Sequence, residues 1–240
     1  MRDLKREQLG DRLKKNFENR YRYYLPRRTY TIIRCDGKAF HSFCKKAEKP
    51  FDSVLIEAMA QTATFLCSKI EGAKLGYVQS DEITVLMTDF DTTNTQSWFD
   101  GNQMKIVSVS AALSTAMFNR LMALSNCDRF DDLAVFDARV FCVPDPAEVA
   151  NNFLWRCRDW ERNSVNMLAR KYHSHKELHG KSMAQMHEMI FQKGDNWANY
   201  PDNIKNGTLI VKDPEEGWVA RGAPKMDYQA FRDLVPNYPS

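Results

Sequence analysis

Two apolar segments of this 240-residue chain each lead into acidic residues, and this pattern constrains the fold most. The first, residues 29–35, is β-branched and apolar and leads into Asp36. The second, residues 77–87, carries Asp81 and Glu82 between two short apolar runs. Such runs predict buried strands, the second pair joined as a hairpin. Carboxylates at strand ends are typical ligands of hard cations, and Mg²⁺ takes one or two of them together with waters and phosphates.

The order of the elements predicts an α+β fold. Helical spacing and strand-like runs alternate along the chain. We expect helices at 3–20, 53–70, 103–124 and 146–172, and strands at 29–35, 77–79, 83–87 and 134–143. From residue 29 to residue 143 the order is β-α-β-β-α-β, the ferredoxin-like arrangement. That arrangement places Asp36 and Asp81 on adjacent central strands, where their side chains can converge.

The C-terminal part of the chain is less regular. The pattern favours a helix at 182–192 and a hairpin built from residues 208–212 and 218–220. We expect the Pro-containing tail after Gly222 to be irregular. The fold class is therefore α+β with a helical and hairpin C-terminal extension.

Composition indicates the cellular compartment in which the protein works. There is no run of about 18 apolar residues, so no membrane span is expected. The N-terminus is charged and lacks an apolar signal region, and the six cysteines form no C-x-x-C pair. These features favour a cytoplasmic protein with reduced thiols. They also indicate a chain with no membrane partner.

The first 28 residues are strongly basic, with ten Lys and Arg against four Asp and Glu. A basic arm on a mildly acidic body favours contact with polyphosphate or nucleic acid. A solvated helix with surplus positive charge explains the same composition equally well. Charge alone does not separate these two interpretations.

The acidic turns are suited to phosphate chemistry. Asp36 and Asp81 would repel each other unless a cation lay between them. Gly37 allows the backbone to approach a cation or phosphate closely, and the amides of residues 38–41 could cradle a triphosphate. Phe40 either stacks on a base or belongs to the core. Candidate phosphate partners are Lys38 and Lys49.

Other motifs, present or absent, indicate which further kinds of chemistry to expect. The chain has no Gly-rich P-loop and no G-x-S-x-G turn, so any chemistry is expected to depend on metal. The series His173, His175 and His179 lacks a fourth zinc ligand, and a polar surface facing RNA is the favoured interpretation. His41 is interpreted as a structural hydrogen-bonding residue, and Asp137 with Arg139 as a structural ion pair.

Several motifs in one order carry a family resemblance. They are Asp36-Gly37-Lys38-Ala39-Phe40-His41-x-Phe43, Lys49-Pro50-x-Asp52, Gln79-Ser80-Asp81-Glu82-Ile83, Lys105-x-x-Ser108, Phe136-Asp137-Ala138-Arg139-Val140, Trp155-Arg156-x-x-Asp159-x-x-x-Asn163 and Lys205-x-Gly207. Together they resemble the tRNA-His guanylyltransferase superfamily, whose members add nucleotides in the 3′→5′ direction. The resemblance covers most of residues 1–210.

The resemblance implies a polymerase palm that uses two Mg²⁺ ions and takes ATP, GTP and other NTPs as substrates. It implies Asp36, Gly37 and Asp81 as metal ligands, with Glu82 in support as a further catalytic residue. Nucleotide binding would involve Gly37, Lys38, Ala39, Phe40, His41, Lys49, Asp52, Ser80 and Lys105. The RNA partner would be a 5′-truncated or 5′-phosphorylated tRNA. Candidate RNA contacts are Arg27, Arg28, Arg156, Asn163, Lys176 and Lys181.

The resemblance also bears on organisation. It suggests a homotetramer, with a palm and N-terminal helix in residues 1–145 and a tRNA-binding extension in 146–240 that packs on the palm as one unit. Where eukaryotic members carry His-Ile-Asn-Asn-Leu-Tyr-Asn, this chain has 161–167, of which only Asn163 matches in the opening half. That departure resembles the bacterial and archaeal branch, which repairs truncated tRNA 5′ ends. Asn102 stands where the family often has Arg, which weakens one expected triphosphate contact.

Three alternatives remain open at the level of sequence. The enzyme adds a single G at position −1 of tRNA-His, or it is a palm-type nucleotide cyclase without an RNA partner. The third is an RNA-binding module on a ferredoxin-like sheet. That alternative ranks last, because the central strands lack the exposed aromatic residues such modules use.

Overall fold

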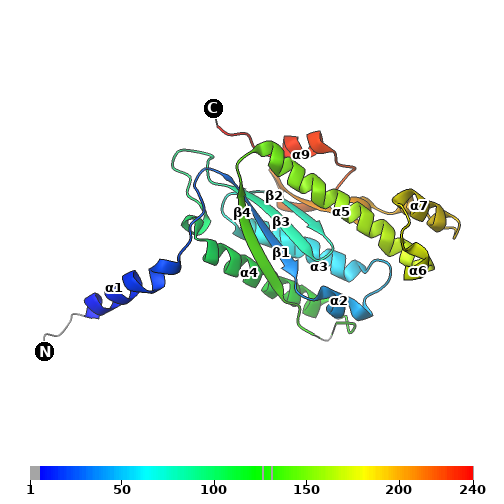
Figure 1. The fold of residues 1–240 in the computed structure, drawn as a ribbon, viewed down its shortest axis with the longest axis horizontal. Helices are drawn as coiled ribbons and strands as arrows, with labels where there is room; N and C mark the ends of the chain where they lie inside the picture. The colour runs from blue at the N-terminus through cyan, green and yellow to red at the C-terminus, as the bar shows by residue number, and fades with distance from the viewer. Residues whose placement is uncertain (1–5, 126, 131, 240) are drawn as a thin grey trace.

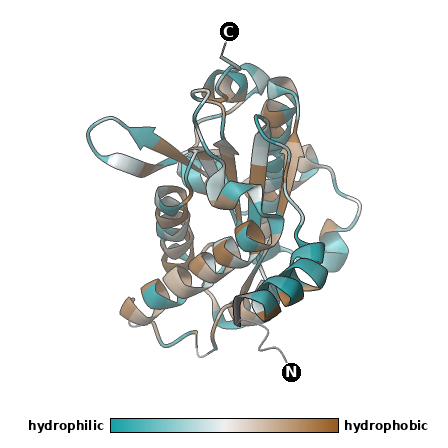
Figure 2. Cartoon of the chain, turned by 90° about the vertical axis from the view of Figure 1, so that its left-hand side faces the viewer, coloured by the Kyte–Doolittle hydropathy of each residue, from teal (hydrophilic) through white to brown (hydrophobic). Residues whose placement is uncertain are grey.

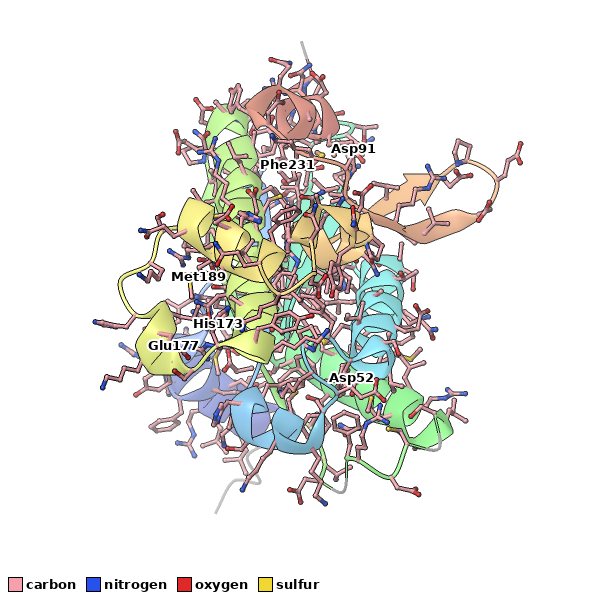
Figure 3. The ribbon with its side chains drawn as sticks, turned by 90° about the vertical axis from the view of Figure 1, so that its right-hand side faces the viewer. Asp52, Asp91, His173, Glu177, Met189 and Phe231 are labelled. Atoms are coloured by element: carbon pink, nitrogen blue, oxygen red, sulfur yellow. The ribbon has the colours of Figure 1, made fainter. Side chains whose placement is uncertain are left out.

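The computed structural model describes residues 6–125, 127–130 and 132–239 and has a six-stranded antiparallel sheet at its centre. The strand order is β4-β1-β3-β2-β5-β6. The strands are β1 (Tyr30–Gly37), β2 (Ala73–Gln79), β3 (Glu82–Thr88), β4 (Phe136–Val143), β5 (Thr208–Asp213) and β6 (Gly217–Gly222). The hairpin predicted from residues 208–220 joins this sheet through pairing of β5 with β2. It projects from the body of the molecule (Figure 3).

Helices cover both faces of the sheet (Figure 1). One face carries α3 (Ser53–Lys69) and α4 (Gln103–Leu124), and the other carries α5 (Pro146–Tyr172) and α9 (Tyr228–Leu234). The order β1-α3-β2-β3-α4-β4 is the predicted ferredoxin-like core, and the α+β prediction is confirmed. The shorter helices are α1 (Arg6–Asn16), η1 (Glu18–Tyr21), α2 (Phe40–Phe43), η2 (Cys44–Lys46), η3 (Trp98–Gly101), α6 (His175–Leu178), α7 (Met183–Phe191), η4 (Trp197–Asn199) and α8 (Asp202–Asn206).

Side-chain caps explain where the long helices begin. Asp52 accepts hydrogen bonds from the amides of Val54 and Leu55 at 3.0 and 3.3 Å, which starts α3 at the predicted position. Asn102 accepts one from the amide of Lys105 at 3.1 Å and starts α4. A cap is the role that the structure shows for Asn102, the residue that departs from the family pattern.

The tail after Gly222 is not irregular as predicted, because it forms α9. Asp227 caps this helix. Phe231 is fully buried and stacks on Phe153 of α5 with 5.9 Å between ring centroids. The helix is only seven residues long. Its stability therefore comes from burying Phe231 and not from helical periodicity, which is why the sequence pattern did not reveal it.

The N-terminal helix α1 extends away from the sheet and its flanking helices (Figure 1). Its ribbon is largely hydrophilic (Figure 2), and Leu9 and Leu13 are exposed. The predicted helix at 3–20 is shorter and ends at Asn16, and its first residues, with Leu4, lie outside the described residues. The chain returns to the body at the bridge between Tyr24 and Asn102.

Helix α4 is long and apolar. By length and composition alone it could cross a membrane. It is the one such helix among the described residues. In the fold, its inner face contributes Ile106 and Phe118 to the core beside α3 and β1.

Candidate active site

The two acidic turns meet at one end of the sheet. Asp36 lies opposite Glu82 on β3 and opposite Asp137 on β4. The amide of Gly37 donates to the carbonyl of Asp81 at 3.0 Å. The antiparallel pairing of β1 with β3 therefore brings Asp36 and Asp81 together, although 45 residues separate them in the sequence.

Burial and like charge at this pair outweigh the neighbouring positive charge of Arg139. Burial raises the pKa of Asp36 to about 6, and the negative charges of Asp81 and Glu82 add to the shift. Burial also raises the pKa of Asp81, against hydrogen bonds from Ser80 and its own amide that lower it. Two carboxylates held in this way are suited to a cation that supplies the missing positive charge.

The donor set fits Mg²⁺ better than a transition metal. Within residues 6–125, 127–130 and 132–239, no three His, Cys, Asp or Glu side chains gather closely enough to hold a metal by themselves. A cation at Asp36 and Asp81 would therefore complete its shell with backbone, water or phosphate oxygens. That mixture is the usual coordination of Mg²⁺.

Glu82 is held differently from its two neighbours. Its carboxylate receives two hydrogen bonds from Arg156, at 2.7 and 2.9 Å, and Arg34 lies 3.5 Å away. Arg156 is only 9% exposed. The guanidinium predicted as an RNA contact is thus occupied with Glu82, whose orientation it fixes. Arg34 was missed at the level of sequence, because nothing in a strand pattern reveals which residue a buried arginine will pair with.

The glycine turn is closely packed. A Cβ added to Gly37 would lie 2.2 Å from the ring of Phe40, so only glycine fits there. Phe40 is buried against Phe43, Phe118 and Phe136, with ring centroids 5.1 to 5.5 Å apart. Of the two interpretations of Phe40, the structure shows the core residue. The amide of Lys38 donates to the carbonyl of Val135 at 2.8 Å, which leaves fewer amides for a phosphate than expected.

A cavity of about 460 Å³ adjoins Asp81. It is lined by α2, the loop before α3, the end of β2 and one side of α5. Four predicted nucleotide residues come together here in addition to Phe40: His41, Lys49, Asp52 and Ser80. A space of this size and mixed lining suits a nucleotide-sized ligand.

Asp52 is fully engaged at the mouth of this cavity. One carboxylate oxygen caps α3, and the other accepts from the amide of Glu48 at 2.9 Å and from Arg129 at 3.1 Å. Figure 3 shows Asp52 at the N-terminal end of α3. It therefore holds the loop that carries Lys49, whose ammonium donates to the carbonyl of Cys44 at 3.4 Å.

Some predicted residues lie elsewhere in the chain. Lys105 is ten residues before Thr115, which bonds the amide of Phe136 near the acidic turns. Ten helical residues span about 15 Å, so Lys105 lies toward the far end of the sheet. Arg27 also lies there, paired with Asp89 at 2.5 Å. Arg28, Lys176 and Lys181 are not among the residues that line the cavity.

His173, the first of the histidine series, lies at the junction of α5, α6 and α7. His173 contacts the carbonyl of Met189 at 3.3 Å through Nε2, and its Nδ1 lies 3.9 Å from Glu177. Figure 3 shows these three residues near one another, apart from Asp52. The pair of Asp137 with Arg139 forms as predicted, at 3.6 Å.

Comparisons with known proteins relate this chain to one family. Residues 11–144 match the family model described as tRNAHis guanylyltransferase. An uncharacterised protein of Acanthamoeba polyphaga mimivirus is 31% identical, with 86% of this chain and 77% of that protein covered. The tRNA(His) guanylyltransferase of Debaryomyces hansenii is 29% identical, with 83% and 78% covered.

Solved structures show the same relationship. A bacterial tRNA(His) guanylyltransferase (Thg1)-like protein in complex with ATP is 40% identical, with a TM-score of 0.86 and coverage of 95% and 99% of the two chains. The enzyme of Saccharomyces cerevisiae is 22% identical with a TM-score of 0.74, which shows a shared fold. The family model, the relatives and the structures together show that this chain belongs to the tRNAHis guanylyltransferase family.

Proposed function

We propose that this protein is a template-dependent 3′→5′ nucleotidyltransferase that repairs the 5′ ends of tRNA. The observation that carries the proposal is the pair Asp36 and Asp81, whose pKa values burial raises, beside a nucleotide-sized cavity. Family membership supports it, as does the solution of bacterial relatives in complex with ATP and with GTP.

In this proposal, Asp36 and Asp81 hold two Mg²⁺ ions together with the Gly37 carbonyl. When bound, the ions supply positive charge to the reacting phosphates and to the diphosphate that leaves. Glu82 is positioned by Arg156 and Arg34 and keeps the β3 end of the turn in place. Lys49 presents its ammonium to nucleotide phosphates at the cavity.

The reaction would have two steps. An oxygen of the RNA 5′-phosphate attacks the α-phosphorus of ATP or GTP, and diphosphate leaves. The 3′-hydroxyl of the incoming NTP then attacks the activated 5′-phosphate, loses its proton, and displaces the nucleoside monophosphate. The chain's contribution is to bring both reactants into line beside the acidic turns, since positioning and electrostatics account for most catalysis of phosphoryl transfer.

The test is extension of a tRNA that lacks its first nucleotide. The protein is incubated with Mg²⁺, ATP, NTPs and the 5′-monophosphorylated RNA, and the product is measured on a sequencing gel. We expect templated lengthening from the 5′ end. Asp36→Ala should abolish it, whereas Glu215→Ala, in the exposed turn of the β5–β6 hairpin, should not. Addition of only one G to tRNA-His would favour single-nucleotide addition instead, and cyclisation of NTP without RNA would favour a cyclase.

We further propose that the protein works in the cytoplasm as a homo-oligomer. The resemblance to the family suggests a tetramer. Light scattering of the purified protein measures this directly, and a monomer at all concentrations would contradict it.

A further inference from the structure

Helix α5 exposes one indole ring on a polar face. Asn152, Trp155, Asp159 and Arg162 share this face, because they recur every three or four residues. Trp155 is 54% exposed, whereas Phe153 on the inner face is fully buried. More than half of the Trp155 surface is therefore open to a ligand.

Two guanidinium groups fix this ring in place. Cζ of Arg156 lies 4.6 Å from the ring centroid, and Cζ of Arg34 lies 5.4 Å from it. Both arginines also contact Glu82, which follows Asp81 directly. The ring is thus tied through charged contacts to the acidic turns. A ring held in one orientation loses little entropy when a flat ligand stacks on it.

The strand order places Trp155 and the cavity on different sides of the acidic turns. Arg34, which contacts Trp155, also lies 5.8 Å from the ring of Phe141 on β4, the edge strand. The cavity instead includes Gln79 of β2 and Thr208 of β5. Strands β1 and β3, which carry the acidic turns, lie between these two sides of the sheet.

This arrangement suits a reaction that joins two substrates. A nucleotide in the cavity reaches the acidic turns from the side of β2. The second reactant, the RNA end, then has to approach from the side of β4 and the outer face of α5. Two exposed arginines flank this approach, each beside a carboxylate: Arg139 on β4 with Asp137, and Arg162 on α5 with Asp159. They are placed to contact backbone phosphates.

We propose that Trp155 is a stacking platform for the nucleobase at the 5′ end of the RNA, an inference that rests on the proposed function. Stacking on an aromatic ring tolerates every base, because each base has a π-face. An enzyme that meets truncated ends of different sequence needs this tolerance. The two guanidinium groups that contact the ring add cation–π contacts to such a stack.

The test measures binding of two RNAs without nucleotide present, by fluorescence anisotropy. One is a 5′-truncated tRNA, and the other has the same sequence with an abasic 5′-terminal nucleotide. We expect the wild-type protein to bind the abasic RNA about tenfold more weakly. Trp155→Ala should bind the intact RNA about tenfold more weakly and lose the difference between the two. Trp155→Phe should retain most of the difference in affinity between the two RNAs.

The control is Phe191→Ala, which removes an aromatic ring of similar exposure on α7 and should bind both RNAs as the wild type does. Equal binding of the two RNAs by the wild-type protein would overturn the inference. So would a Trp155→Ala variant that binds both RNAs more weakly by the same factor and changes its mass in light scattering, because the ring would then belong to a protein interface. If Trp155→Ala does not fold, the binding of intact and abasic RNA by the wild type and by Trp155→Phe still tests the inference.

Failure of this inference is distinct from failure of the proposed function. A wild-type protein that does not extend tRNA contradicts the function. A protein that extends tRNA but binds the abasic end normally contradicts only the role of Trp155.

Discussion

The fold lowers the pKa of the Asp195 carboxyl group and raises the pKa of the Asp36 carboxyl group. Asp195 lies beside the C-terminal end of α5 and accepts hydrogen bonds from the hydroxyls of Tyr172 and Tyr200 at 2.6 and 2.9 Å. The hydrogen bond from Tyr172 is the largest cause that holds its pKa below the usual value. Burial and neighbouring negative charges instead raise the pKa of Asp36 to about 6.

The difference separates a structural carboxylate from a candidate ligand. Donors that surround Asp195 stabilise its charge and hold α5 to the segment after α7. At Asp36 and Asp81, burial and like charge outweigh the groups that stabilise the ionised form, which costs folding free energy unless a cation binds. Sites of this kind are functional candidates because stability alone does not explain them. The predictions that follow test this contrast, from the largest effect to the smallest.

Removal of either acidic-turn carboxylate should abolish activity. Asp36→Ala or Asp81→Ala takes away a ligand of the cation that would hold the reacting phosphates. We expect a loss of activity of about 10³-fold or more, which corresponds to about 4 kcal/mol. The measurement is single-turnover extension of the truncated tRNA. Asp195→Asn is the matched carboxylate control and should keep activity. Extension within tenfold of wild type in both alanine variants would contradict the assignment.

Removal of Arg156 should destabilise the fold. Arg156→Met leaves the buried charge of Glu82 with the longer contact to Arg34 and a hydrogen bond from Thr84, and loss of one partner of a buried pair costs about 3–5 kcal/mol. Urea denaturation at neutral pH measures this. Arg158→Met, on the exposed side of the same helix, should change the free energy of unfolding by less than about 0.5 kcal/mol. A similar small change for Arg156→Met would show that the pair is not formed.

Asp195→Asn should destabilise the protein moderately. Hydrogen bonds to a charged acceptor contribute about 1.5–3 kcal/mol, and the amide that replaces it still accepts one of them. We expect a loss of about 1–2 kcal/mol in thermal unfolding. A double-mutant cycle with Tyr172→Phe should give a coupling of at least about 0.5 kcal/mol. If the two changes in the free energy of unfolding are strictly additive, this result would argue against a direct hydrogen bond between Tyr172 and Asp195.

The smallest effect is expected from Asp36→Asn in metal-free protein. Because the folded state raises the pKa of Asp36, ionisation near pH 7 disfavours folding, and a neutral amide should stabilise the protein by about 1 kcal/mol. Excess Mg²⁺ should raise the melting temperature of the wild type by binding the folded state. It should raise that of the variant much less. An equal response to Mg²⁺ would place the cation elsewhere.

Much of the fold was predictable from local signals. Asp52 before α3 and Asp145 with Pro146 before α5 are recognisable helix starts, and the apolar runs around Asp81 predict the hairpin. Helix α9 was not predictable, because its one buried residue, Phe231, packs against the rings of Tyr77 and Phe153, which are distant in the sequence. The cluster of Arg34, Glu82 and Arg156 was equally hidden, since its members come from two strands and a helix.

The sequence by itself determined the order of the elements and the two acidic turns, because capping, turn chemistry and hydrophobic period act over a few residues. Its motifs also determined the family. The tertiary structure decided which charges meet: Arg156 with Glu82, and Asp36 with Asp81. It also decided which residues stay apart, such as Lys105 and the acidic turns. Pairing between distant charges depends on strand register and helix packing, and no local pattern in the chain encodes either one.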